Sequence, residues 1–226
     1  MSRLLTISVF SLLLSQIALG QESDTTDWKD IYRPTGIRFG TDLISLAKIP
    51  FSDRFDGWEV SVDVDFYKYY LTAEVGSWEK TLVSPTQSYT NSGSYYRIGA
   101  DVNLLLKDPE RNMFFLGLRY AHSNFSEQLS YRTDDPVFGS LEQVSNNAAM
   151  RAGWAEVTLG LRVKIWKQLW MGYTARLKVA PTIGTESEFE PYDIPGYGLA
   201  SKSTYWGFNY QLYWRIPLRK SVLPEE

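Results

Sequence analysis

The chain has 226 residues, a formal net charge of −3 and no cysteine, which suits one domain and excludes disulfides, thiolate metal sites and cysteine nucleophiles. The negative charge, with no basic patch in any segment, argues against nucleic acid as a partner, because that binding depends on neutralising phosphates. Eight Trp and fifteen Tyr suit either a carbohydrate-binding surface or a membrane interface.

Residues 1–20 differ from the rest of the chain and predict a cleaved signal peptide. Arg3 is followed by an apolar run, Leu4 to Leu14, and by the small-residue site Ala18-Leu19-Gly20. A transmembrane anchor is the alternative, but this run is shorter than the roughly 20 residues that cross a bilayer as a helix. We therefore expect export through the general secretory pathway and a mature chain that begins at Gln21.

The mature chain is predicted to have a polar, disordered periplasmic leader at residues 21–34, a repetitive region at 35–218 and a short C-terminal tail at 219–226. Within the repetitive region, eight runs alternate apolar with polar residues, which is the period of β-strands. These runs are Gly36–Leu46, Trp58–Phe66, Leu71–Val75, Tyr96–Leu104, Phe114–Tyr120, Ala155–Ile165, Met171–Val179 and Trp206–Trp214.

The first run is the least regular of the eight, and it suggests a β-bulge near Thr41. The second run is clearer, because its Trp, Val and Phe side chains share one face and its Glu, Ser and Asp side chains share the other. No segment after the signal peptide is apolar enough to span a membrane as a helix, so any membrane crossing must use strands.

The connections between the runs alternate in length. Long loops are expected at Glu79–Gly93, Ser123–Gly153 and Pro181–Ser203, with a shorter one at Pro50–Gly57. Tight turns are expected around Lys68 and Tyr69, Asp108 to Asn112, and Lys167 and Gln168. Short turns on one side and long loops on the other are typical of outer-membrane barrels.

Trp and Tyr residues gather near both ends of the runs, as expected for two aromatic girdles at the surfaces of a bilayer. The loop-side girdle is predicted to contain Trp58, Trp78, Tyr96, Tyr120, Trp154 and Trp206. The turn-side girdle is predicted to contain Tyr67, Tyr70, Trp166, Trp170 and Trp214.

Together these patterns predict an all-β protein, an eight-stranded antiparallel transmembrane up-and-down β-barrel in the outer membrane of a Gram-negative cell. One alternative is a soluble periplasmic lipocalin-like ligand-binding barrel, which has the same period of two but turns its apolar face inward. A second alternative is an outer-membrane enzyme that modifies lipid.

Several segments resemble an uncharacterised outer-membrane β-barrel family that is classified as a domain of unknown function. They are Gly36–Leu43, Gly117–Tyr120, Trp154–Glu156 and Tyr192–Tyr197, and the resemblance extends from about Tyr32 to Arg219. The resemblance implies the outer-membrane location and the barrel fold. It carries over no catalytic, cofactor-binding or metal-binding residue.

The polar face of the runs carries both signs of charge, and in a narrow barrel these charges can pair and fill the lumen. The predicted lumen network consists of Asp63, Glu74, Arg97, Asp101, Arg119, Glu156, Arg162 and Arg176. A five-residue turn at Asp108–Asn112 would place Asp101 directly opposite Arg119, and a shift of two residues would leave them diagonal neighbours. Asp63 and Glu74 are expected to face each other across their own turn.

The sequence offers few candidate catalytic or metal-binding residues. His122 is the only histidine and lies at the predicted outer rim, but Ser123 faces the other side and Ser126 is about 13 Å away along an extended strand. The loop with Glu186, Glu188, Glu190 and Asp193 suggests calcium, but it lacks the spacing of a calcium loop, so a solvated acidic loop is the simpler interpretation. The adjoining segment Tyr192–Tyr197 is either a recognition surface or an ordinary turn formed by its Asp, Pro and Gly residues.

The last run ends in alternating aromatic residues and is predicted to be the assembly signal, with Gly207, Tyr210, Leu212 and Trp214 as its key residues. The expected partners are outer-membrane lipid, together with the barrel-assembly machinery and periplasmic chaperones during insertion. The sequence identifies no ligand for the surface loops. An eight-stranded barrel has just enough interior for side chains, so we expect a structural or surface-interaction role rather than a diffusion pore.

Overall fold

The computed structural model describes residues 32–48, 55–105, 112–135, 139–184 and 187–219. Arg33–Lys220 form one compact unit. Of the other unit, Met1–Tyr32 with Ser221–Glu226, only Tyr32 is described. The predicted signal peptide therefore lies outside the described residues, as do most of the predicted leader and tail.

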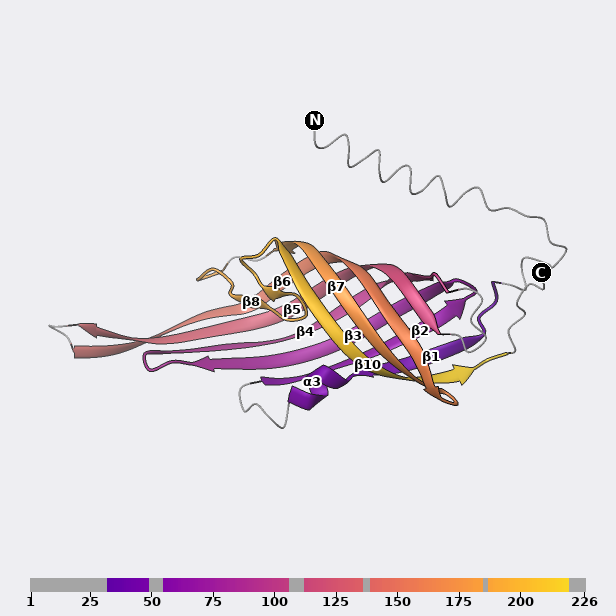
Figure 1. Cartoon of the computed structure of the whole chain (residues 1–226). Coiled ribbons are helices and arrows are strands. Elements are labelled where there is room, and N and C mark those ends of the chain that lie inside the picture. Colours follow the sequence, from indigo (N-terminus) through magenta and orange to yellow (C-terminus); the bar gives the residue numbers. More distant parts are fainter. Residues whose placement is uncertain (1–31, 49–54, 106–111, 136–138, 185–186, 220–226) are drawn as a thin grey trace, which may run out of the picture. The chain divides into compact units, whose positions relative to one another are not determined.

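The described chain is almost entirely β-strand, with one short helix (Figure 1). Its elements are β1 (Gly36–Asp42), α3 (Leu43–Lys48), β2 (Phe55–Phe66), β3 (Tyr69–Val83), β4 (Gln87–Asn103), β5 (Met113–Asp135), β6 (Gly139–Trp166), β7 (Leu169–Ile183), β8 (Asp193–Ile194), β9 (Gly198–Leu199) and β10 (Thr204–Pro217). In the described ranges, no helix has the length and apolar character needed to cross a membrane.

Eight of the strands pair antiparallel in chain order, and β1 pairs with both β2 and β10, which closes the sheet into a barrel. The two remaining strands, β8 and β9, form a separate small hairpin between β7 and β10. The prediction of an all-β protein with eight antiparallel up-and-down strands is thus confirmed. Closure matters because it leaves neither end of the sheet as an open edge.

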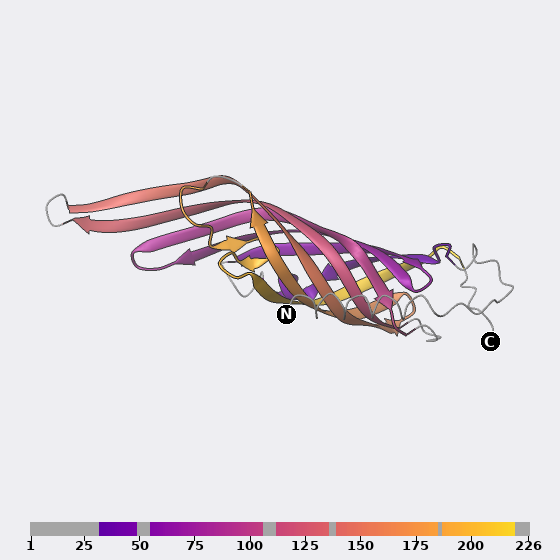
Figure 2. The ribbon, with the colours of Figure 1, turned by 90° about the horizontal axis from the view of Figure 1, so that it is seen from above.

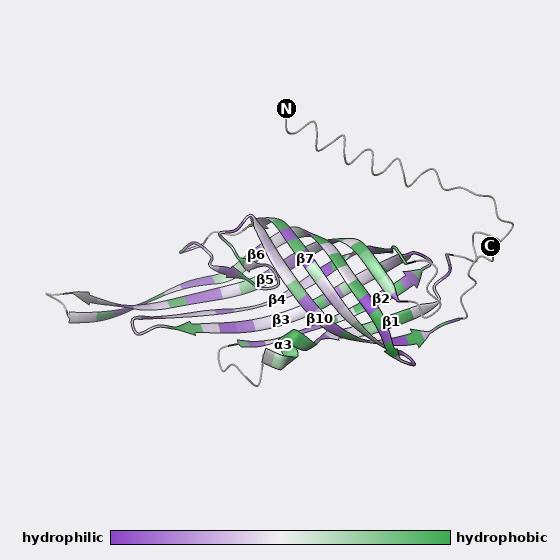
Figure 3. Ribbon diagram, in the orientation of Figure 1, coloured by the Kyte–Doolittle hydropathy of each residue, from purple (hydrophilic) through white to green (hydrophobic). Residues whose placement is uncertain are grey.

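The two faces of the barrel wall have opposite character, as the alternation in the sequence predicts. Side chains on the outer face are mainly apolar and exposed. Figure 3 shows hydrophobic and hydrophilic residues alternating along the strands of the barrel. They include Leu71, Ile98, Leu118, Val157, Leu159, Leu161, Val163, Phe208 and Trp214. The side chains that point inside are mostly polar or charged and are buried. This distribution is the reverse of that in a soluble protein.

Strands β3 to β6 continue far beyond the rest of the barrel as two long hairpins (Figure 2). The expected loops at Glu79–Gly93 and Ser123–Gly153 are wrong, because most of these residues continue the strands and stay paired, such as Leu82 with Tyr89 and Leu129 with Ser145. Sequence reasoning took their many Ser, Asn and Gln residues for loop. The hydrogen-bonded ladder needs no apolar face, so the strands extend wherever a neighbouring strand supplies partners.

The turns on the opposite side are short, as expected. Tyr67 and Lys68 connect β2 to β3, and Lys167 and Gln168 connect β6 to β7. Tyr67 and Lys167 have positive φ angles of 62° and 37°, which two-residue hairpin turns commonly require. Of the turn expected at Asp108–Asn112, only Asn112 is described.

The bulge expected near Thr41 is wrong, because β1 pairs without interruption up to Asp42. The irregular pattern has another cause: the chain leaves the barrel wall there and becomes helix α3. The carboxylate of Asp42 accepts hydrogen bonds from the backbone N and Oγ of Ser45, at 3.1 and 2.7 Å, and so caps the helix. The other oxygen of Asp42 accepts from the backbone N of Tyr210 on β10, at 3.1 Å.

Only some of the residues predicted for the two aromatic girdles are exposed on the outer face. Trp58, Tyr96, Tyr120 and Trp206 are exposed on the outer face near the long hairpins, and Trp166 and Trp214 are exposed near the short turns. Four of the girdle assignments are wrong, because strand parity directs these side chains to the inside. These are Tyr70, Trp78, Trp154 and Trp170, of which Trp154 is 2% exposed.

Candidate functional site

The interior of the barrel contains a network of ion pairs. Its members come from β1 to β7, and each is at most 4% exposed. Five are arginines (Arg38, Arg97, Arg119, Arg162 and Arg176) and five are carboxylates (Glu59, Asp63, Glu74, Asp101 and Glu156). The charges of these ten residues balance, which a low-dielectric interior requires.

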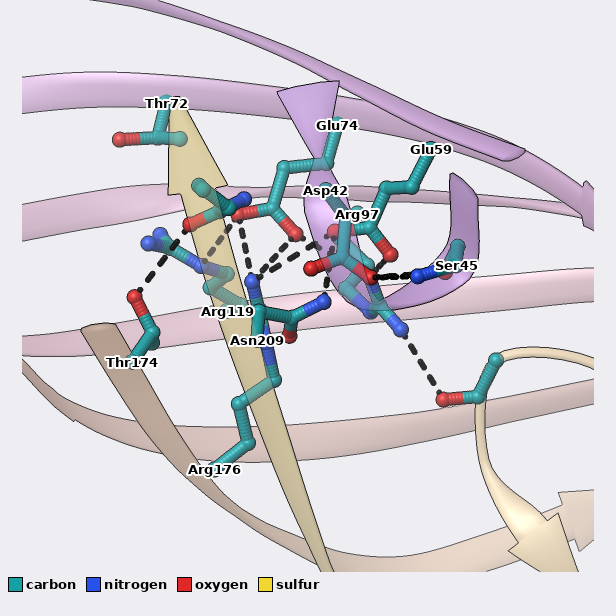
Figure 4. Close-up of polar contacts among 12 residues, drawn as sticks. Asp42, Ser45, Glu59, Thr72, Glu74, Arg97, Arg119, Thr174, Arg176 and Asn209 are labelled. Atoms are coloured by element: carbon teal, nitrogen blue, oxygen red, sulfur yellow. Dashed lines mark hydrogen bonds and ion pairs between the residues drawn. The ribbon is translucent and has the colours of Figure 1, made fainter. Parts of the chain in front are cut away.

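The part of the network nearer the long hairpins centres on two arginines (Figure 4). Arg97 contacts three carboxylates, with distances of 2.7 Å to Glu59, 3.1 Å to Glu74 and 3.0 Å to Glu156. Arg176, on the opposite wall, lies 2.9 Å from Glu74 and 3.1 Å from Glu156. The planar guanidinium group has five donors, so one arginine can hold carboxylates from several strands together.

The part nearer the short turns has the same design. Asp63 lies between Arg38, at 2.7 Å, and Arg162, at 2.8 Å. Asp101 lies between Arg119, at 3.0 Å, and Arg162, at 3.4 Å. A contact of 3.4 Å between Arg119 and Glu74 joins the two parts into one network. The network therefore ties opposite walls of the barrel together and occupies its interior.

All eight residues of the predicted lumen network face the interior, but two details of the predicted pairing are wrong. Asp101 pairs with Gly117, and Arg119 pairs with Gly99, so the two charges are diagonal neighbours instead of direct partners. β4 ends at Asn103, whose side-chain oxygen accepts from the backbone N of Leu105 at 3.0 Å, so an Asx turn begins before the expected five-residue connection.

The second detail concerns the hairpin of β2 and β3. Asp63 pairs with Thr72, and Glu74 pairs with Ser61, so the two acids are also diagonal neighbours. The two-residue turn at Tyr67 and Lys68 sets this register. The separation reduces the repulsion between the acids, and each of them contacts its own arginines.

Sequence reasoning missed two members of the ion network, Arg38 and Glu59, and the residue Asn209 that links it to β10. Arg38 was missed because the first run looked irregular, and Glu59 was seen on the polar face but not assigned to the network. Asn209 on β10 donates to Glu59 at 3.2 Å and accepts from Arg176, which connects the last strand to the network. Strand parity alone would have identified all three as interior residues.

The segment Tyr192–Tyr197 is folded into the mouth of the barrel, so its suggested role as a recognition surface is wrong for most of its length. Ile194 and Tyr197 are fully buried, and the ring of Tyr197 meets that of Trp154 edge to face at 5.5 Å. Gly196 has a φ angle of +82°, and an added Cβ would lie 2.6 Å from the ring of Tyr95. The β8–β9 hairpin therefore acts as a plug that needs glycine at this turn.

Interior cations hold the plug through its backbone. Arg97 donates to the carbonyl oxygen of Gly196 at 3.0 Å, and Lys178 donates to the carbonyl oxygens of Gly196 at 2.7 Å and Tyr197 at 3.0 Å. Residues of the long hairpins hold the other side. Lys80 lies 2.7 Å from the carboxylate of Asp193. Burial raises the pKa of Asp193, and the hydrogen bond from Lys80 opposes that rise.

The part of the chain that precedes the plug, between β7 and β8, is also held by hydrogen bonds to buried side chains. Glu127, which is 2% exposed, accepts hydrogen bonds from the backbone N atoms of Tyr192 and Asp193, at 3.1 and 3.2 Å. The side chain of Asn147 donates to the carbonyl oxygen of Phe189 and accepts from the backbone N of Glu188. The mouth is thus covered by a segment with defined partners.

The structure gives no support to a catalytic role for His122. Its side chain is on the outer face beside Tyr96, with the two rings 5.6 Å apart. Ser123 is buried on the inner face and donates to the carbonyl oxygen of Ser94, at 3.2 Å. Ser126 lies on the same exposed face as His122 but four residues farther along the strand.

The acidic loop does not form a cation site within the described residues. Glu188 accepts from the backbone N of Asn146, and Asp193 is paired with Lys80, while Glu186 lies outside the described residues. Across the described ranges, no group of three or more His, Asp or Glu residues is arranged to hold a metal ion.

The residues of the predicted assembly signal all lie on β10. Tyr210, Leu212 and Trp214 are on the outer face, and Gly207 is on the inner face, where an added Cβ would meet the side chain of Lys178 at 2.8 Å. Their role in assembly remains a prediction.

Comparison with known families gives one match. A family described as Domain of unknown function (DUF6048) matches residues 1–221. The chain belongs to this family. The predicted membership of an uncharacterised family is therefore confirmed, and the DUF6048 match covers every element of the barrel. Comparisons with curated proteins and with solved structures give no match.

Proposed function

We propose that the mature chain is an integral outer-membrane protein that inserts as a closed barrel and has a structural or surface-interaction role. The observation that carries this proposal is the inverted distribution of side chains, apolar on the outside and charged on the inside. In water, exposed residues such as Leu118, at 62%, and Ile98, at 54%, would form an apolar belt around the molecule. In a bilayer the same belt faces lipid.

The dimensions of the outer face support the proposal. On β10, Trp206 and Trp214 are exposed at the two ends of a nine-residue stretch with Phe208 and Tyr210 between them. A tilted strand needs about 9–11 residues to cross a bilayer. Aromatic residues at both ends of that stretch are what two membrane interfaces favour.

The filled interior supports a structural role rather than transport. The ion network links opposite walls, and the β8–β9 plug covers the mouth, so ions crossing the barrel would have to separate buried charge pairs. We therefore expect no steady conductance from the protein in planar bilayers.

The long hairpins are the candidates for surface interaction. From Tyr120 in the outer girdle to Asp135 at the end of β5 there are fifteen residue steps, which at about 3.3 Å each span roughly 50 Å along the strand. A hairpin of this length would reach well beyond the lipid headgroups.

The two alternatives are less favoured. A lipocalin-like barrel binds its ligand in an apolar interior, whereas this interior is ionic. A lipid-modifying enzyme needs a nucleophile or base within hydrogen-bond reach of a partner, and His122 has only an aromatic neighbour in the described contacts.

Single-cysteine labelling in intact cells tests the proposal, because the natural chain contains no cysteine. We expect Val144→Cys, on a long hairpin, to react with a membrane-impermeant maleimide in intact cells. Gln168→Cys, in a short turn, should react only after the outer membrane is permeabilised. Recovery of the protein in the soluble fraction, or the reverse labelling pattern, would refute the proposal.

A further inference from the structure

A groove on the outer face of the sheet lies directly beyond the outer aromatic girdle. It has a volume of about 540 Å³ and is lined by residues of β3, β4, β5 and β6. A continuous row of paired residues crosses it, in which Ser77 pairs with Ser94, Ser94 with Asn124, and Asn124 with Arg151. The row offers hydroxyl, amide and guanidinium groups side by side on one face.

Arg151 supplies the positive charge of this groove. Its side chain is exposed, and among the residues that the structure describes no carboxylate lies within ion-pair distance of it. The arginines of the interior, in contrast, each contact at least one acid. A guanidinium group without an internal partner at a polar groove is suited to an external anion, with which it forms paired hydrogen bonds.

Toward the barrel, the residues on this outer face change from polar to apolar and aromatic. Two residues along each strand from the polar row lie Val75, Tyr96 and His122, which are paired in sequence across β3, β4 and β5. The next row contains Ile98 and Tyr120, which are 54% exposed each. A cationic, hydrogen-bonding row above an apolar and aromatic surface would match a molecule with an anionic head and a hydrocarbon tail.

We propose that this groove binds the phosphorylated headgroup of an outer-leaflet lipid, with Arg151 on the phosphate and Asn124, Ser94 and Ser77 along the rest of the headgroup. The acyl chains then lie on the apolar rows below, along Ile98 and Leu118. This inference rests on the proposed membrane location, because it identifies the girdle near the long hairpins as the outer interface. In this arrangement His122, beside Tyr96, lies between the headgroup row and the apolar belt.

A lipid is favoured over a free anion by the combination of the two surfaces. Free phosphate would contact only Arg151 and its polar neighbours in an open groove, where water competes strongly. A lipid keeps its phosphate next to the groove because its chains are held in the bilayer, which raises the effective concentration of the head.

The test uses the purified full-length mature protein in detergent micelles, titrated with bisphosphorylated lipid A and, separately, with its dephosphorylated form. Native mass spectrometry measures the fraction of protein with bound lipid. We expect the phosphorylated lipid to bind at least about tenfold more tightly than the dephosphorylated one, and Arg151→Gln to remove most of that difference. Inorganic phosphate at the same concentration should not displace the lipid.

Arg132→Gln is the matched control. Arg132, on β5, is also exposed on the outer face, but it is not among the residues lining the groove. It should retain the preference for phosphorylated lipid, and Arg151→Lys should retain part of it. Equal binding of the two lipids, or equal losses in Arg151→Gln and Arg132→Gln, would overturn the inference. The cysteine-labelling experiment is scored separately, so a correctly inserted barrel without lipid preference would refute only the groove.

Discussion

Breaking one ion pair inside the barrel should destabilise the protein strongly, and removing both partners should cost far less than the two single losses added together. Arg119 and Asp101 are the best pair for this test, because they are 3.0 Å apart and both are nearly inaccessible to solvent. Leucine is the replacement in each case, since it removes the charge and keeps an apolar side chain in the interior.

The expected magnitude follows from the partners that remain. In Arg119→Leu, Asp101 keeps Arg162 at 3.4 Å, and Glu74 keeps Arg97 and Arg176. The loss in the free energy of unfolding should therefore lie near the lower end of the range for a broken buried pair, about 3 kcal/mol.

Asp101→Leu should cost a similar amount, about 3 kcal/mol, because it leaves Arg119 with only the 3.4 Å contact to Glu74. The double variant leaves neither partner alone. We expect it to lose about 2 to 3 kcal/mol in total, which corresponds to a coupling energy of about 3 to 4 kcal/mol.

The assay is reversible urea unfolding in lipid vesicles, followed by tryptophan fluorescence. Arg132→Leu, on an exposed hairpin, is the control for the arginine-to-leucine change and should stay within about 0.5 kcal/mol of the natural protein. Losses that add to within about 0.5 kcal/mol in the double variant would refute the reasoning, because they would mean that the two residues do not interact.

The remaining predictions concern export, closure, assembly and the plug. Mass spectrometry of the secreted protein should give a chain that begins at Gln21, and a retained Met1 would refute cleavage. The protein should migrate differently on gels before and after boiling, because a closed barrel resists detergent, whereas equal mobility would point to a soluble protein. Trp214→Asp should prevent insertion by placing a charge on the outer face of β10, and normal heat-dependent mobility of this variant would contradict the assembly signal. Gly196→Ala should loosen the plug and increase proteolysis between β7 and β10 while the barrel stays folded; unchanged proteolysis would show that the turn tolerates a Cβ.

The fold class follows from local patterns in the sequence. An alternation with a period of two assigns each side chain to one face, whatever lies around it. For this reason the sequence correctly identified the apolar outer face and the eight charged residues that point inside. It also predicted the two-residue turns, where short connections between clear runs leave no other arrangement.

Other features depended on partners distant in the sequence. The long hairpins of β3 to β6 have polar side chains on both faces over much of their length, so periodicity could not distinguish them from loops, and only strand pairing defines them. The end of β1 depends on Asp42, which both caps α3 and bonds to Tyr210 on the last strand. The same limit applied to register, because the pairing of β4 and β5 differs by two residues from the pairing that a five-residue turn would give.

The sequence by itself determined which side chains face inward and which face outward, because strand parity is a local property of the backbone. Only the tertiary structure decided which charges meet and what closes the mouth. Arg176 reaches Glu74 across the barrel, and Lys178 holds the carbonyl oxygens of Gly196 and Tyr197. Such contacts exist only once the sheet has closed, since closure brings opposite walls within the combined reach of two long side chains.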